Sequence, residues 1–259
     1  MSEQVSSPSE GGEVTLDLPQ SVCIAIPSYQ GQLPVLLASA LIELTYSLRS
    51  KGIKVAVSFE HENALIDLAR NRLVSTYLKQ TDYEKIFWID DDIIFDPDDA
   101  ERLLAWSTLY PIVAATYPVR QDPPKFFMRR ESEKWEQNEY GLFKIIGTGL
   151  GFTVMDRSVF DKMAPTTDTF IMEGEEHKAF FKITQENKVY YGEDIYFFKR
   201  WHDEFGGHVW LDPSINLGHF GHKTFDYKFL DYLKGLYKSE TNLQNNLVNG
   251  NDKPDNPKL

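Results

Sequence analysis

The chain has 259 residues, 42% hydrophobic and 14% aromatic, which is enough to bury the core of one large α/β domain or two small ones. Its formal net charge of −12 argues against a surface that coats nucleic acid or anionic lipid, although a local basic groove would still admit a nucleic-acid acceptor. No apolar run reaches transmembrane length, the acidic N-terminus lacks a secretory start, and the single cysteine lies in an apolar run, so we expect a cytoplasmic protein without a membrane span.

Both ends of the chain have compositions typical of disordered segments. Residues 1–17 are rich in Ser, Glu and Gly, and residues 241–259 are rich in Asn, Asp and Pro. We therefore predict two disordered tails around one folded domain over residues 18–240.

Within that domain, short β-type runs alternate with helical ones, which predicts an α/β fold with a mostly parallel sheet flanked by helices. In chain order, we expect the strand Val22–Ile26, a helix over Leu36–Leu48, the strand Ile53–Phe59, a helix over Glu62–Lys79, the strand Lys85–Ile89, a helix that begins at Pro97 and the strand Ile112–Ala115. Beyond Tyr117, strands alternate with irregular stretches, including the strand Phe152–Met155, until the helix Gly192–Phe205 and the short strand Val209–Leu211.

An acidic triplet, Asp90-Asp91-Asp92, directly follows the buried strand Lys85–Ile89. The carboxyl ends of parallel strands are where open α/β sheets bind ligands. Three adjacent carboxylates repel one another unless a cation or solvent compensates, and strand alternation points Asp90 and Asp92 to one side, toward one ion. Such oxygen ligands suit Mg²⁺ or Mn²⁺, which also bind diphosphate oxygens. The triplet therefore predicts a divalent metal site, with a solvated acidic turn as the alternative.

Several motifs, in this order along the chain, resemble those of the GT-A glycosyltransferases. Ile24–Tyr29 is similar to the nucleotide-binding opening of family 2 glycosyltransferases, and Ala69–Asn71 to their Arg-Asn element. Trp88–Asp92 corresponds to the Asp-x-Asp motif. Tyr191–Asp194 resembles the Gly-Glu-Asp segment of the polypeptide N-acetylgalactosaminyltransferases, and Leu217–His219 falls where that family places a Gly-His pair.

The resemblance implies a GT-A, Rossmann-like fold with a nucleotide-binding half over residues 18–120 and a mixed acceptor or lid half over residues 121–240. It implies a metal-dependent glycosyltransferase that uses a nucleotide-diphosphate sugar, with UDP or GDP as the expected nucleotide. The acceptor is left open among a glycan, a protein, a small molecule and a nucleic acid. Donor sugar and stereochemistry also stay open, because the family 2 motifs favour inversion and the Gly-Glu-Asp segment favours retention.

Residue roles follow from the same resemblance and from the local sequence. Asp90, Asp92 and His219 are the expected Mn²⁺ or Mg²⁺ ligands, with His222 as a substitute for His219. The nucleotide would be held by residues from three segments: Pro27, Ser28, Tyr29, Arg70, Asn71, Asp90 and Asp91. Arg70 has the alternative of pairing with Asp67 one helical turn earlier.

Asp194 and Glu193 are the expected catalytic residues. Asp194 opens a helix and lies at helical spacing from Phe198 and Trp201, so we expect it to point inward and to take a proton from an acceptor hydroxyl. Glu193 is expected on another side of the helix, facing an acceptor hydroxyl.

Three features leave alternatives. The glycine-dense segment Gly147–Gly151 lacks the spacing of a dinucleotide loop, so it indicates either close approach to a sugar or a sharp turn. The basic run from Arg120 to Arg130 fits an anionic acceptor or a solvated face. For the whole chain, a sugar nucleotidyltransferase and a non-catalytic nucleotide-sugar-binding module are the competing functions.

Overall fold

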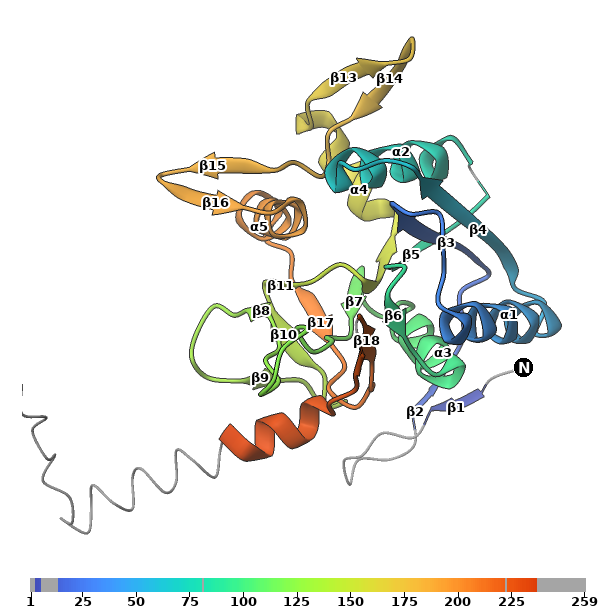
Figure 1. The fold of residues 1–259 in the computed structure, drawn as a ribbon, viewed down its shortest axis with the longest axis vertical. Coiled ribbons are helices and arrows are strands. Elements are labelled where there is room, and N and C mark those ends of the chain that lie inside the picture. The colour runs from blue at the N-terminus through green and yellow to red at the C-terminus, as the bar shows by residue number, and fades with distance from the viewer. Residues whose placement is uncertain (1–2, 6–13, 81, 222, 237–259) are drawn as a thin grey trace, which may run out of the picture.

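The computed structural model describes residues 3–5, 14–80, 82–221 and 223–236, and these form a three-layer α/β structure around a twisted eight-stranded sheet (Figure 1). The sheet order is β4-β3-β5-β12-β7-β17-β10-β9. Its strands are β3 (Ser21–Ser28), β4 (Lys54–His61), β5 (Lys85–Ile89), β7 (Ile112–Ala114), β9 (Glu136–Gln137), β10 (Phe143–Ile145), β12 (Phe152–Asp156) and β17 (Val209–Leu211).

Six of these eight strands point the same way. Strands β3, β4 and β5 are mutually parallel, and β7 is parallel to β17. Strand β12 is antiparallel to both β5 and β7, and β10 is antiparallel to both β17 and β9. The mostly parallel α/β sheet predicted from the sequence is therefore confirmed, with β12 inserted in reverse between two strands that share a direction.

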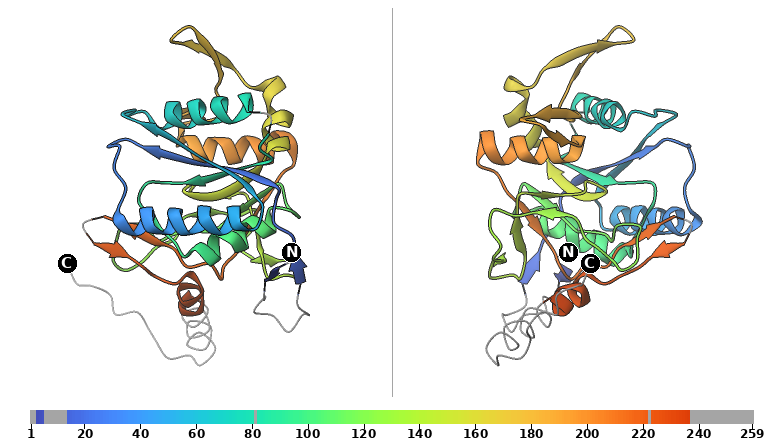
Figure 2. Two further views of the ribbon diagram at one scale, coloured as in Figure 1. Left: turned by 90° about the vertical axis from the view of Figure 1, so that its right-hand side faces the viewer. Right: turned by 60° about the vertical axis from the view of Figure 1, so that its left-hand side comes forward.

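Helices cover both faces of the sheet, because alternate residues of its central strands are apolar on each side. One face packs against α1 (Val35–Ser50) and α3 (Pro97–Trp106), with Ile24 and Phe87 from the strands. The other face packs against α2 (Ile66–Lys79), α4 (Arg157–Met163) and α5 (Glu193–Phe205), with Ala25 and Trp88 from the same strands. The two faces are visible on either side of the sheet in Figure 2.

Small ribbons decorate this core. Hairpins β13–β14 (Thr169–Met172, Glu175–Lys178) and β15–β16 (Thr184–Glu186, Val189–Tyr191) project from the α2, α4 and α5 side (Figure 1). Strands β8 (Met128–Arg129) and β11 (Gly147–Thr148) pair with each other, a 3₁₀ turn spans Ala164–Thr166, and residues 229–236 are helical. A three-stranded sheet joins β6 (Ile93–Ile94), β18 (Gly218–Phe220) and β19 (Thr224–Phe225).

The N-terminal segment differs from the expected tail over the part that is described. Within residues 1–17, β1 (Glu3–Val5) pairs antiparallel with β2 (Val14–Leu16), and Leu16 is buried against the core. The expected C-terminal tail, residues 241–259, lies outside the described residues.

Candidate functional site

One edge of the sheet gathers the predicted site residues. The carboxyl ends of β3, β5 and β7 lie there because these strands share a direction, and the start of β12 lies there because it runs in reverse. A cleft of about 670 Å³ opens at this edge. It is lined by the turn after β3, the start of α2, the acidic triplet and the β18–β19 turn: Pro27, Ser28, Tyr29, Gln30, Gln32, Leu33, Pro34, Asn63, Ala64, Ile66, Ala69, Arg70, Asp90, Asp91, Asp92, Arg120, Phe220 and Gly221.

Arg70 joins the acidic triplet to helix α5. Its Nη2 lies 3.1 Å from Asp90 Oδ1 and 3.2 Å from Asp90 Oδ2, and its Nε lies 3.5 Å from Glu193 Oε1. The residue is only 4% exposed, and its Nε and Nη1 are buried without a hydrogen-bond partner among the described residues. The expected alternative, a pair between Arg70 and Asp67, is not the contact that forms.

Burial and mutual repulsion make it costly for the acidic triplet to carry its full negative charge. Burial raises the pKa of the Asp90 carboxyl to about 6, and the positive charge of Arg70 opposes that rise. The negative charge of Asp92 raises the pKa of Asp90 further. Burial also raises the pKa of Asp91, although a hydrogen bond from Ser28 lowers it in part. An added cation would relieve this repulsion.

Asp92 meets a cation and an imidazole. Arg120 Nη2 donates to Asp92 Oδ2 in a short ion pair, and His219 Nε2 lies 3.4 Å from the same oxygen. Strand pairing sets this arrangement, because His219 of β18 stands opposite Ile93 of β6, the residue directly after the triplet.

The hydrogen bonds of His219 leave one ring nitrogen able to bind a metal. Its Nδ1 lies 2.9 Å from the carbonyl oxygen of Pro118, which can only accept, so Nδ1 carries the proton. When the ring is neutral, its Nε2 lone pair faces Asp92 Oδ2, and either a proton or a cation must lie between them. The ring of Tyr117 packs edge-on at 5.2 Å and helps to fix the imidazole in this orientation. Metal-binding histidines commonly hold their second nitrogen in this way.

The charge balance and donor set of the site fit a divalent metal in part. Two guanidinium groups, Arg70 and Arg120, face five carboxyl groups, those of Asp90, Asp91, Asp92, Glu193 and Asp194. Oxygen donors with one imidazole suit Mn²⁺ or Mg²⁺. Among the described residues, however, Asp90, Asp92 and His219 do not bring three potential ligand atoms within 4.8 Å of one another. Asp92 and His219 are already adjacent, whereas Asp90 is held by Arg70.

The two acids at the start of α5 take different positions from those expected. Glu193 is the more buried, at 8% exposure, and it contacts Arg70. Asp194 is half-buried, and its Oδ1 accepts from the backbone N–H of Ile195. The buried stripe of α5 runs through Glu193, Phe197 and Trp201, so the inward-pointing acid is one residue earlier than predicted. Asp194 still acts electrostatically on Asp90 and Arg70.

Asn71 does not face the cleft. Its side-chain Nδ2 donates to the carbonyl oxygen of Phe181 at 2.7 Å, and its Oδ1 accepts from the Phe181 N–H at 3.0 Å. The prediction that Asn71 binds the nucleotide does not fit this geometry, because both ends of its amide bind the backbone of Phe181 in the loop before β15. Consecutive helical residues point about 100° apart, so Arg70 and Asn71 cannot share one face.

The glycine-dense segment is packed against side chains. A Cβ on Gly151 would meet Asp90 Oδ2 at 2.7 Å, and one on Gly147 would meet Phe198 Cβ at 2.6 Å. The Gly151 N–H donates to the hydroxyl of Tyr117 at 3.4 Å, and the Asp90 N–H donates to the Gly151 carbonyl at 3.0 Å. Of the two expectations for this segment, the turn is the one observed, because Leu150 and Gly151 form a turn that leads directly into β12. The glycines let the backbone approach Asp90.

From the sequence, Arg120 belongs to a basic run that fits an anionic acceptor or a solvated face, and Tyr117 has no predicted role. Arg120 lines the cleft and pairs with Asp92. Tyr117 is partly buried, accepts from the Gly151 N–H and interacts electrostatically with Asp90 and Arg70. Both residues follow β7, whose carboxyl end lies at the same sheet edge as that of β5. Their position after a predicted parallel strand is the sequence feature that could have identified them as site residues. His222, the substitute ligand, lies outside the described residues.

No described helix is both long enough and apolar enough to cross a bilayer. No protein-family model matches the sequence, and no curated protein matches it.

Solved structures do match the fold. Crystal structures of A197 from STIV, GalNAc-T7 with UDP, GalNAc and Mn²⁺, and S. aureus TarS 1–349 share 18%, 12% and 13% identity with this chain, at TM-scores of 0.49, 0.47 and 0.42. The matches cover 80%, 78% and 74% of this chain and 90%, 43% and 58% of those chains, so it spans less than two thirds of the last two. A glycosyltransferase is also among the solved structures to which this chain is similar. At these identities and at TM-scores below 0.5, the similarity carries no argument about function.

Proposed function

We propose that this protein is a metal-dependent glycosyltransferase that moves a sugar from a nucleotide-diphosphate donor to an acceptor. The observation that carries the proposal is the 3.4 Å approach of His219 Nε2 to Asp92 Oδ2 beside an acidic cleft, with Nδ1 of the same ring held by the Pro118 carbonyl oxygen. The excess of carboxylates over guanidinium groups at this edge favours a bound divalent cation, and the cleft volume accommodates a nucleotide.

In this proposal Mn²⁺ or Mg²⁺ would be held by Asp92 and His219, with Asp90 as the third residue. When bound, such an ion stabilises the negative charge that develops on a diphosphate leaving group. The buried guanidinium of Arg70 orients Asp90 through a hydrogen bond, and the ion pair with Glu193 orients Arg70 in turn. Glu193 is thus a positioning residue here.

The nucleotide would lie along the turn after β3, where Pro27, Ser28 and Tyr29 line the cleft beside Asp91. Tyr29 is 62% exposed and offers a ring face on which a base can stack. Arg120 lines the same cleft and is able to pair with phosphate oxygens once a metal neutralises Asp92.

Asp194 is the proposed base for an inverting transfer. Its carboxylate lies at the N-terminal end of α5 and is more accessible than that of Glu193. An acceptor hydroxyl within hydrogen-bond reach would give its proton to Asp194 as it attacks the sugar.

The test is a panel of UDP- and GDP-sugars incubated with the protein and Mn²⁺, with release of the nucleoside diphosphate as the readout. We expect slow donor hydrolysis that stops in excess chelator. Release of pyrophosphate from a nucleoside triphosphate and a sugar phosphate would instead identify a nucleotidyltransferase. Binding of the donor without any turnover, in the presence of a broad acceptor set, would identify a non-catalytic module.

A further inference from the structure

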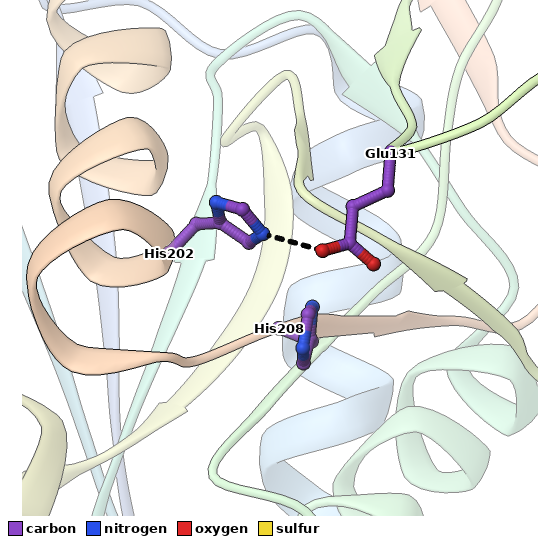
Figure 3. Close-up of side chains that lie close together, drawn as sticks. All are labelled: Glu131, His202 and His208. Carbon is purple, nitrogen blue, oxygen red and sulfur yellow. Dashed lines mark hydrogen bonds and ion pairs between the residues drawn. The ribbon is translucent and has the colours of Figure 1, made fainter.

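A second group of metal-binding side chains lies at the other end of α5. Among the described residues, one group of three possible metal ligands has its ligand atoms all within 4.8 Å of one another, and it consists of Glu131, His202 and His208. Figure 3 shows the two imidazoles and the carboxylate turned toward one another. None of the three lines the cleft.

Three separate segments supply these side chains. Glu131 follows β8, His202 lies in the last turn of α5, and His208 directly precedes β17. The chain reverses between the two histidines at Gly206, whose φ of 65° is the left-handed conformation that ends the helix. His202 is nine residues after Glu193, about 14 Å along the helix, so the two ends of α5 cannot share one ion.

The contacts of His202 suit a metal ligand. Its Nδ1 lies 2.8 Å from Asp203 Oδ1, and its Nε2 lies 2.9 Å from Glu131 Oε1. A carboxylate on Nδ1 supports the tautomer in which Nε2 carries the lone pair, the arrangement found behind metal-bound histidines. In that tautomer Nε2 and the Glu131 oxygen are two lone pairs facing each other, and either a proton or a cation must lie between them.

His208 adds to this pattern. Its Nδ1 is buried and makes no hydrogen bond to any described residue. Lys144 lies 3.6 Å from Glu131 Oε2, the oxygen that does not face His202.

We propose that Glu131, His202 and His208 bind a zinc-class transition-metal ion. Two imidazoles and one carboxylate are a ligand set that such ions favour, whereas Mg²⁺ favours oxygen ligands. Bonds of about 2.1 Å place two ligand atoms at most about 4.2 Å apart, which is close to the 4.8 Å within which the three atoms of this cluster lie. Because the ligands come from three segments, the ion would fasten the loop after β8 to the end of α5.

The test measures Zn²⁺ binding by calorimetry to the full chain, stripped with chelator, at pH 7.5. The background is the double variant Asp92→Asn/His219→Ala, which removes the proposed cleft site from the titration. We expect one Zn²⁺ per chain, a higher melting temperature with Zn²⁺, and no competition from excess Mg²⁺.

Added substitutions locate the ion. Glu131→Gln and His208→Gln should each weaken Zn²⁺ binding at least about tenfold, and Asp203→Ala by about 10–100-fold through the lost support of His202. Glu133→Gln, an exposed acid in the same loop, is the matched control and should bind as the background does. Because Glu131 is exposed, its substitution leaves the fold intact, which circular dichroism verifies. Absence of saturable Zn²⁺ binding in the background, or unchanged binding by Glu131→Gln, would overturn the proposal and assign the cluster to a shared proton.

Discussion

At the scale of single residues, His219 and Asp194 have separable tasks in the proposed mechanism. His219 presents its bare Nε2 to Asp92, and Asp194 sits on a different element, at the start of α5. Binding of metal and nucleotide should therefore depend on the first residue, and the chemical step on the second.

We predict that His219→Ala weakens Mn²⁺-dependent UDP binding by at least about tenfold, because the ion loses a ligand. Calorimetric titration with UDP at fixed Mn²⁺ measures this. The control is His61→Ala, since His61 is exposed and does not line the cleft. Equal affinity of both variants would exclude His219 as a ligand.

The companion prediction is that Asp194→Asn binds UDP and Mn²⁺ as the unmodified protein does but slows transfer by about 10²–10⁴-fold, because the acceptor proton loses its base. Steady-state transfer rates and calorimetry on the same preparation separate the two effects. Full activity in Asp194→Asn would favour a retaining reaction without a protein base.

At the scale of elements, the glycine-dense segment before β12 controls the position of Asp90. We predict that Gly151→Ala weakens Mn²⁺-dependent nucleotide binding, because the new Cβ would lie 2.7 Å from Asp90 Oδ2 and displace it. Gly235→Ala is the control, since an added Cβ there meets nothing within 4 Å. Unchanged nucleotide affinity in a folded Gly151→Ala protein would show that the Asp90 position is not critical.

Elements differ in how far the sequence predicts them. Strand β5 and the triplet follow from an apolar run that ends in three acids, and α3 from Pro97 after the capping residue Asp96. The strand Phe152–Met155 is also predicted, but its reversed direction is not, because an apolar pattern carries no information on direction. The pairing of Arg120 with Asp92 is not predicted for a related reason: an arginine in a loop reaches the triplet only because β5 and β7 share an edge. The sequence analysis chose Asp194 instead of Glu193 as the inward-pointing acid, because the rotation of α5 about its axis is set by tertiary packing.

At the scale of the whole molecule, two carboxyl groups whose pKa burial raises to about 6, Asp90 and Asp99, set the pH dependence of stability. The folded state binds these protons more tightly than the unfolded chain does. Their stabilisation is therefore complete near pH 4 and is lost as the pH rises through about 6. The pKa of His202 is also raised, chiefly by its hydrogen bond to Asp203, and acts with the same sign. Burial lowers the pKa of His208, which acts with the opposite sign.

We therefore predict that the chelator-treated protein melts at a higher temperature at pH 5 than at pH 7. Asp99→Asn should flatten this profile, because the amide can still accept from the Asn216 N–H but no longer titrates. Thermal melts from pH 5 to 8 measure the effect. A melting temperature that falls steadily from pH 7 to pH 5 would contradict the burial of these acids.

The central claim is that a divalent metal held at Asp92 and His219 binds the nucleotide. Its most direct test is the melting temperature of the protein with UDP or GDP, with Mn²⁺ or with excess chelator, for the unmodified chain and for Asp92→Asn. We predict that one of the nucleotides raises the melting temperature only when Mn²⁺ is present, and that Asp92→Asn loses this rise while remaining folded. Equal stabilisation by nucleotide in excess chelator, or an undiminished rise in Asp92→Asn, would contradict the account.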